Sequence, residues 1–114
     1  MITGAHSILF AHDADAARAF LRDVLGFDAV DVGGGWLIFA LPPAELAVHP
    51  VDGPPTHELY LMCDDIAATL TVLEERGVEI AKPVSDEGWG LLARIVVPGF
   101  GELGIYEPRH PVPR

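Results

Sequence analysis

The feature that most constrains the fold is a motif that occurs twice at the same spacing. Asp13 precedes an apolar stripe with the three-and-four spacing of a helix, and Gly26 follows it. Asp64 precedes a second stripe that ends at Gly77, so aspartate and glycine lie 13 positions apart in both copies, which are offset by 51. The aspartate can cap a first helical turn, and the glycine can adopt the left-handed conformation that ends a helix. The chain is therefore predicted to be an internal duplication.

Each copy is predicted to be a strand, a helix and three further strands. Alternating or continuous apolar residues predict the strands, and glycine and proline clusters predict the turns between them. In the first copy the strands are residues 4–11, 27–32, 36–41 and 45–49, and the helix is 14–25. In the second they are residues 57–63, 78–81, 90–97 and 102–106, with the helix at 65–76. A proline-rich linker, residues 50–56, divides the copies, and the tail 107–114 is expected to be a surface segment.

Composition narrows the class of protein. The chain has 114 residues, half of them hydrophobic, which is one domain's worth of core. Its net charge of −10 and only seven basic residues argue against a nucleic-acid backbone as partner. No apolar run has membrane-spanning length and no secretory signal pattern is seen, so a cytoplasmic protein is expected. Cys63, the one cysteine, ends an apolar strand and is expected to be an inert buried thiol.

The repeat, together with the stretch FLRDVLGF at residues 20–27 and a histidine seven residues before Asp13, resembles the vicinal oxygen chelate superfamily. That family includes glyoxalase I, bleomycin-resistance proteins and extradiol dioxygenases. The resemblance implies an α+β fold over one domain, residues 1–114, in which tandem βαβββ modules (about 4–50 and 57–107) form a curled mixed-sheet cup with helices outside. It also implies a small-molecule ligand and a homodimer that completes the cup.

In metal-dependent members of that family, His and Glu side chains from the first and last strands of each module hold a divalent ion. The resemblance places His6 at the first-strand position. For the strand at 57–63, family spacing selects Glu58, whereas the internal offset of 51 selects His57. Neighbours on a strand point to opposite faces, so only one can face the cup. We take Glu58 as the inward residue and keep His57 as the alternative.

The last strand of each module departs from the family pattern. Ala47 and Gly104 stand where metal-dependent relatives place a carboxylate. Other polar side chains lie two residues away, on the same face by the period of two; they are Glu45, His49, Glu102 and Tyr106. A shifted ligand set of His6, His49, Glu58 and Glu102 is the candidate metal site. Imidazole and carboxylate ligands would suit Zn, Ni, Mn or Fe(II).

Two functions of different classes follow. In the first, a metal ion polarises a substrate with two neighbouring oxygens and Glu102 or Glu58 moves the proton, as in a glyoxalase-like lyase or isomerase, or a dioxygenase. In the second, a metal-free cup sequesters a cationic or aromatic drug or metabolite, as bleomycin-resistance relatives do. A third hypothesis is a dimeric interaction module with a vestigial cup. The residues expected to contact the ligand are Phe10, Trp36, His57, Trp89 and Tyr106.

Overall fold

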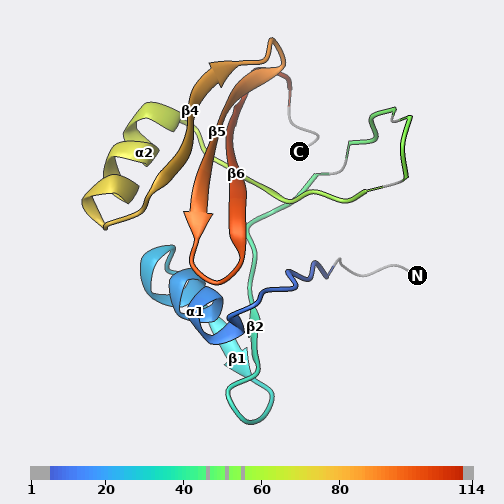
Figure 1. Cartoon of the computed structure of the whole chain (residues 1–114). Coiled ribbons are helices and arrows are strands. Elements are labelled where there is room, and N and C mark those ends of the chain that lie inside the picture. Colours follow the sequence, from blue (N-terminus) through green and yellow to red (C-terminus); the bar gives the residue numbers. More distant parts are fainter. Residues whose placement is uncertain (1–5, 46, 51, 55, 112–114) are drawn as a thin grey trace.

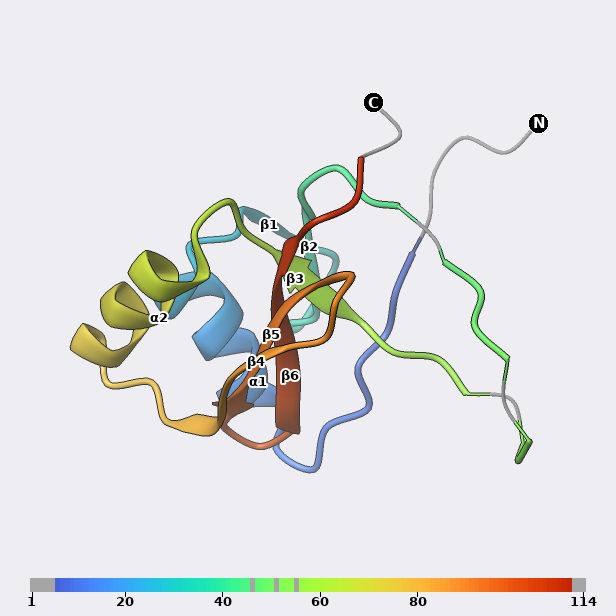
Figure 2. The ribbon, with the colours of Figure 1, turned by 90° about the horizontal axis from the view of Figure 1, so that it is seen from above.

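The computed structural model describes residues 6–45, 47–50, 52–54 and 56–111. The outer ends of the predicted first strand and of the tail, and single residues of the predicted strand 45–49 and of the linker, lie outside that range. In Figure 1 the larger sheet lies above a small hairpin, and Figure 2 shows both helices on one side of this sheet. Long extended segments lie on the other side. No helix within the described ranges is long and apolar enough to cross a membrane.

The second half of the chain forms the predicted strand, helix and three strands. They are β3 (Tyr60–Met62), α2 (Ile66–Glu75), β4 (Ile80–Asp86), β5 (Gly90–Val97) and β6 (Gly101–Pro108). The sheet order is β3-β6-β5-β4, with β3 parallel to β6 and the other pairs antiparallel. The bounds of β5 are those predicted from its apolar run, and β6 extends beyond the predicted segment at both ends. The predictions for the other two strands were partly wrong: β3 is shorter than the predicted 57–63, and β4 begins and ends later than the predicted 78–81.

Helix α2 covers the sheet because its apolar stripe is buried. Ile66, Leu70 and Leu73 are each at most 7% exposed and belong to one core with Ala93 and Ile95 of β5. The capping residue is Asp65, whose side chain accepts a hydrogen bond from the Ala68 amide at 3.0 Å. The cap predicted at the neighbouring Asp64 is wrong by one position. Gly77 ends the helix at φ +83°, in the left-handed region that glycine favours.

The first helical segment has the predicted cap but an unexpected end. The Asp13 side chain accepts from the Ala16 amide at 3.0 Å and starts α1 (Ala14–Ala19). The chain then widens into a π-helix, η1 (Phe20–Val24), in which the Leu25 amide bonds to the Phe20 carbonyl at 3.2 Å. A π turn takes up one extra residue. This explains why cap and glycine lie 13 positions apart in the first copy and, counted from the observed cap, 12 in the second.

Two predicted strands of the first half are not strands in the structure. In the described part of the first half, only the hairpin β1 (Ala29–Asp31) and β2 (Leu37–Phe39) is paired, at the places predicted for the two middle strands. Residues 6–11, and 45 and 47–49 of the segment 45–49, are assigned no strand. A strand exists only with a hydrogen-bonded neighbour, and these extended segments have none in the described part of this single chain. Their apolar side chains are exposed, Ile8 by 58%, Phe10 by 88% and Val48 by 89%.

The fold is therefore the predicted α+β class, with helices on one face of mixed and antiparallel sheets that form no closed barrel in the part of the chain that the structure describes. The core residues of β5, of β6 and of the segment 59–63, which contains β3, face the helices; they are Leu59, Leu61, Cys63, Leu91, Ala93, Ile95, Val97, Leu103 and Ile105. Because strand side chains alternate, the residues between them lie on the opposite face. We call that opposite surface, with Tyr60, Leu92, Arg94, Gly104 and Tyr106, the open face.

Candidate functional site

The open face is organised by the register of three strands. Tyr60 of β3 and Arg94 of β5 both pair with Gly104 of β6, so all three lie in one row across the sheet. In the next row, Tyr106 of β6 pairs with Leu92 of β5. The cross-strand neighbours on one face of a sheet lie about 5 Å apart. Two tyrosines and one arginine are thereby held close together in the middle of the sheet.

Gly104 is required by the ring of Tyr60. A Cβ atom at Gly104 would lie 2.5 Å from Cε1 of Tyr60, and closer still to Cδ1, far inside van der Waals contact. The tyrosine ring thus fills the space above the strand into which any side chain at this position would project. On the other side of Gly104, the guanidinium carbon of Arg94 lies 6.0 Å from the centre of the Tyr60 ring, within the range of a cation–π contact.

Three aromatic rings follow one another along the open face. The rings of Tyr60 and Tyr106 are 6.1 Å apart and nearly perpendicular, at 76°. Trp89 lies 5.4 Å from Tyr106 at 74° and is 41% exposed. Edge-to-face rings at these distances stabilise one another. We call Tyr60, Tyr106 and Trp89 the aromatic row.

Polar groups hold both tyrosine hydroxyls. The Tyr60 hydroxyl donates to Oε2 of Glu58, and this hydrogen bond, together with burial, raises the pKa of Tyr60 above its ordinary value. Tyr60 therefore stays a protonated donor at neutral pH. The same bond places the Glu58 carboxylate beside Tyr60, on the side of the chain away from the core residue Leu59.

The second tyrosine is held by the tail. The Tyr106 hydroxyl shares a hydrogen bond with Nε2 of His110, which lies 3.5 Å from Oε2 of Glu45. Burial and the nearby Glu45 carboxylate raise the pKa of Tyr106. The tail is fixed by Arg109, whose amide bonds to the Trp89 carbonyl at 3.0 Å. The sequence predicts residues 107–114 only as a surface segment. A proline-rich tail contains no signal that predicts the contact of His110 with Tyr106.

A pocket of about 360 Å³ lies beside the aromatic row, where the extended segment 7–10 runs past Arg94 and the start of β6. It brings together four predicted site residues, Phe10, His57, Glu58 and Glu102. The buried hydroxyl of Ser7 also lines it and has no hydrogen-bond partner among the described residues. A buried polar atom without a partner is costly, so a polar ligand group or a water molecule in this pocket would stabilise the site.

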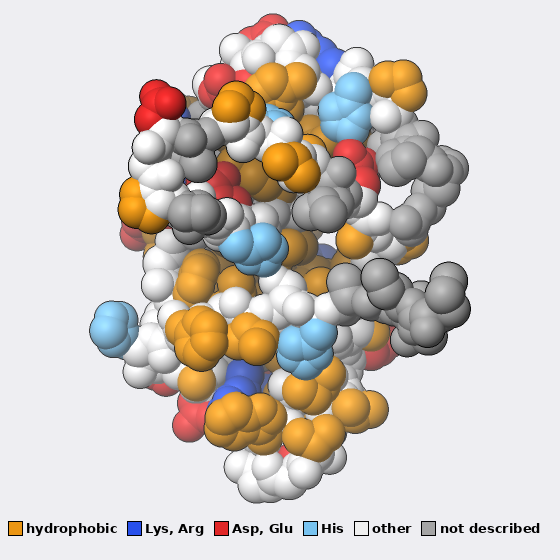
Figure 3. All heavy atoms as spheres, turned by 90° about the vertical axis from the view of Figure 1, so that its right-hand side faces the viewer, with side chains coloured by type: hydrophobic (Ala, Val, Ile, Leu, Met, Phe, Trp, Pro, Cys, Tyr) orange, Lys and Arg blue, Asp and Glu red, His pale blue; other side chains and the backbone are white. Residues whose placement is uncertain are grey.

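Other predicted site residues lie elsewhere. His6 and His49 are exposed and do not line this pocket. Trp36 is at the β1–β2 hairpin, where the Arg18 guanidinium covers its ring at 4.9 Å. Figure 3 shows hydrophobic side chains gathered in the lower part of the molecule, where the hairpin lies. Among the residues that the structure describes, no three His, Cys, Asp or Glu side chains form a group that could hold a metal ion.

Two residues that sequence reasoning missed define the open face. The sequence predicts Tyr60 only as part of an apolar strand, and it predicts no role for Arg94. The signal for Arg94 is a single cation inside the otherwise apolar run of β5. The signal for Tyr60 is its position two residues after Glu58, across from a strand glycine.

This geometry can be compared with that of known proteins. The fold and the open face define a small α+β domain whose sheet has one helix-covered face and one face lined by aromatic side chains. The family model of the Glyoxalase/Bleomycin resistance protein/Dioxygenase superfamily matches residues 4–109, and the chain belongs to this superfamily. Members typically bind divalent metals, bind small molecules and often form dimers. No significant sequence match was found among curated proteins.

Three solved structures are similar over nearly the whole chain. TnmS3, an antibiotic binding protein from Streptomyces sp. CB03234, is 27% identical with a TM-score of 0.63, covering 95% of this chain and 99% of that one. A glyoxalase/bleomycin resistance protein from the same organism is 28% identical with a TM-score of 0.58, covering 86% and 94%. Lactoylglutathione lyase from Agrobacterium tumefaciens is 21% identical with a TM-score of 0.67, covering 92% of each chain, and supports the fold alone.

The open face of this chain does not fit the metal that its superfamily typically holds. Where a carboxylate would project from the last strand, Gly104 has no side chain and the Tyr60 ring fills the space. Arg94 places a positive charge in the same row and also lines the pocket that contains Glu58 and Glu102. Because Coulomb repulsion grows with charge, a guanidinium among these carboxylates opposes a divalent ion more strongly than a singly charged aromatic molecule. In addition, the Glu58 carboxylate is already engaged, because it accepts a hydrogen bond from the Tyr60 hydroxyl.

Proposed function

We propose that the protein binds a small planar aromatic molecule on the open face without a metal ion, and that it sequesters this molecule rather than transforming it. The observation that supports the proposal is the replacement of the expected carboxylate by the pair of Gly104 and the Tyr60 ring. It removes a ligand for a metal and adds an aromatic surface at the same place.

The polar side chains of the pocket would select the ligand. In this proposal Glu58 and Glu102 accept hydrogen bonds or pair with a positive group of the ligand, and neither acts as a proton-transfer group. His57 and Phe10 complete the wall on the side of the extended segments. A net charge of −10 favours the approach of a cationic aromatic molecule. The similarity to an antibiotic binding protein supports an antibiotic or a related metabolite as the ligand class.

A second copy of the chain would complete the site. The segments 6–11 and 47–49 are extended, have no strand partner among the described residues and expose Ile8, Phe10 and Val48. Strand β3 is at one edge of the sheet. Exposed apolar segments and an open edge are features that strand pairing between chains removes. We therefore propose a homodimer in which these segments become paired strands.

The two tryptophans allow a direct test of ligand binding. Trp36→Phe leaves Trp89, which belongs to the aromatic row, as the one tryptophan of the chain. Trp89→Phe leaves Trp36, which Arg18 covers at the hairpin. Each variant is titrated with proflavine, a planar cation, and with metal-free bleomycin, a basic glycopeptide, both in the presence of a chelator. We expect saturable quenching of Trp89 by at least one of the two probes.

The matched variant provides the control. In the Trp89→Phe protein, the emission of Trp36 should change far less at the same probe concentration. Absence of saturable quenching of Trp89 by both probes would contradict the proposal, as would quenching that occurs only after a divalent metal is added.

A further inference from the structure

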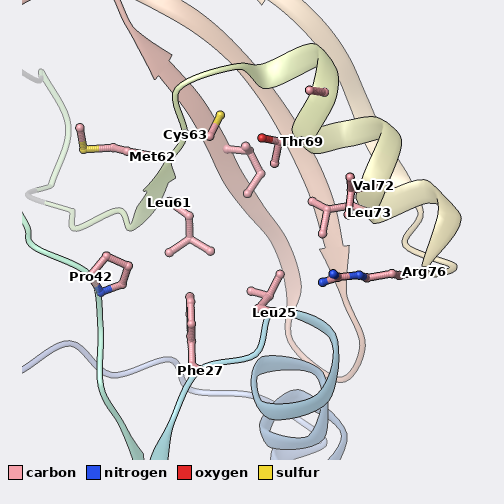
Figure 4. A pocket seen from close by; sticks show the side chains of 12 residues that line it. Leu25, Phe27, Pro42, Leu61, Met62, Cys63, Thr69, Val72, Leu73 and Arg76 are labelled. Atoms are coloured by element: carbon pink, nitrogen blue, oxygen red, sulfur yellow. The ribbon is translucent and has the colours of Figure 1, made fainter.

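A second cavity lies on the other side of the sheet from the open face. It has a volume of about 400 Å³ and lies between α2, β3 and the segment that follows η1. Figure 4 shows the side chains around it. Leu61 comes from β3 and Val72 from α2, Cys63 follows β3 and Arg76 follows α2, and Leu25 and Phe27 come from the first half. Small-molecule sites typically measure about 300–1,000 Å³. We call this the helix-side cavity.

Arg76 is the charged residue of the helix-side cavity. The other side chains that line it in the described structure are apolar except for Thr69 and the Cys63 thiol. Thr69 is already engaged, because its hydroxyl donates to the Asp65 carbonyl at 2.8 Å. Arg76, the residue that follows α2, reaches toward Leu25 (Figure 4), and its Nη1 donates to the Val24 carbonyl at 2.8 Å.

The guanidinium of Arg76 has N–H groups that its contact with Val24 does not use. A guanidinium has five N–H groups, of which this contact uses one. No carboxylate of the described residues lies within ion-pair distance of it. The remaining groups can bind one carboxylate or sulfonate, and such charge-assisted bonds are the strong ones.

We propose that the helix-side cavity binds a small apolar molecule that has one negative charge, with Arg76 as the residue that pairs with the charge. An apolar body fits the leucine, valine and phenylalanine walls. The overall charge of −10 disfavours anions elsewhere on the protein, so a preference for an anion would be diagnostic of the local cation. This site is separate from the one under the proposed function, and its ligand class is of opposite charge.

Cys63 gives a readout that is specific to this cavity. It is the one cysteine of the chain, it is partly buried, and it lines the cavity. Its alkylation by iodoacetamide, a small neutral reagent, is followed by intact mass with and without 2-naphthylacetate. We expect a saturable slowing of alkylation by this anion. The neutral analogue 2-naphthylacetamide should need about tenfold or more higher concentration, since it lacks the charge-assisted bond.

Paired variants test the role of Arg76. Arg76→Gln should remove the advantage of the acid over the amide, while Arg22→Gln should keep it, because Arg22 is exposed on η1 and pairs with Asp23. A second pair of variants, at Val72, keeps Arg76 itself and so does not remove its hydrogen bond to the Val24 carbonyl. Val72 lies one turn before Arg76, so the carboxylate introduced by Val72→Glu would occupy the guanidinium and weaken binding of the acid, whereas Val72→Gln would not.

Several outcomes would overturn the proposal. They are the absence of protection by the acid, equal protection by acid and amide in the unmodified protein, or an acid preference that survives both Arg76→Gln and Val72→Glu. Protection that rises with protein concentration without any probe would also overturn it and assign the cavity to a contact between copies. Tyr60→Ala, which alters the open face, should leave the protection unchanged; if it abolishes the protection, the probe binds at the other site.

Discussion

The fit between Gly104 and the Tyr60 ring makes a strong prediction for Gly104→Ala. The new Cβ would lie 2.5 Å from Cε1 of Tyr60. Carbon atoms in contact lie about 3.5–4.0 Å apart, so the ring must move by at least about 1 Å. The ring would turn away from the sheet and lose its edge contact with Tyr106 and its hydrogen bond to Glu58. Overpacking of this kind costs about 1–3 kcal/mol in the free energy of unfolding.

A double-mutant cycle separates this clash from other effects of the substitution. In a Tyr60→Ala background the ring is absent, and alanine in a strand is then favoured over glycine by about 0.5–1 kcal/mol. The sign of the Gly104→Ala effect should therefore reverse, giving a coupling energy of at least about 1.5 kcal/mol between the two positions. Urea unfolding followed by far-UV circular dichroism of the four proteins measures it.

Gly90 offers a control for the same cycle. A Cβ at Gly90 would lie 2.7 Å from the carbonyl oxygen of Glu107, a backbone atom that the Tyr60 ring does not displace. Gly90→Ala should destabilise the protein to a similar extent with and without Tyr60. If Gly104→Ala costs the same in both backgrounds, the ring does not fill the space over Gly104 and the argument against a carboxylate at this position is refuted.

Probe binding, dimer formation and the burial of the thiol each give one further prediction. Tyr60→Ala should weaken binding of the aromatic probe about tenfold in the Trp89 quenching assay, since one aromatic contact and its buried area are lost; unchanged affinity would place the ligand elsewhere. Phe10→Asp should shift the protein from dimer to monomer in light scattering after size exclusion, whereas Val72→Asp, also exposed but on α2, should not; a dimer in both variants would contradict strand pairing through residues 6–11. Burial raises the pKa of the Cys63 thiol, so its alkylation rate should reach half its maximum at a higher pH than that of an unfolded control, and a midpoint at or below the control would show that the thiol is not buried.

The second half of the chain could be predicted from sequence because its elements satisfy one another locally. The apolar run of β5 and the stripe of α2 are buried together, and β6 pairs with β5 along its whole length. The cap was misplaced by one residue because Asp64 and Asp65 are adjacent and chemically equivalent. Only the backbone decides between them, and Asp65 has the extended conformation (φ −146°, ψ 100°) of a residue that precedes a helix.

The first half could not be predicted in the same way. Its outer segments alternate as strands do, yet a strand needs a partner, and within one chain they have none in the described structure. The π turn of η1 likewise has no signature in the apolar spacing. Of the predicted site residues, Glu58, Glu102, Trp89 and Tyr106 lie near the open face. Tyr60, Arg94 and His110 were missed, since their roles depend on neighbours distant in sequence.

The most direct test of the account is the dissociation constant of one aromatic probe, measured by calorimetry once with excess chelator and once with saturating Zn or Ni. If ligand binding depends on the aromatic row rather than on a metal, the two values should agree within error, and the metal alone should give no stoichiometric heat. Binding that requires the metal, or stoichiometric metal binding that His6→Ala abolishes, would contradict it.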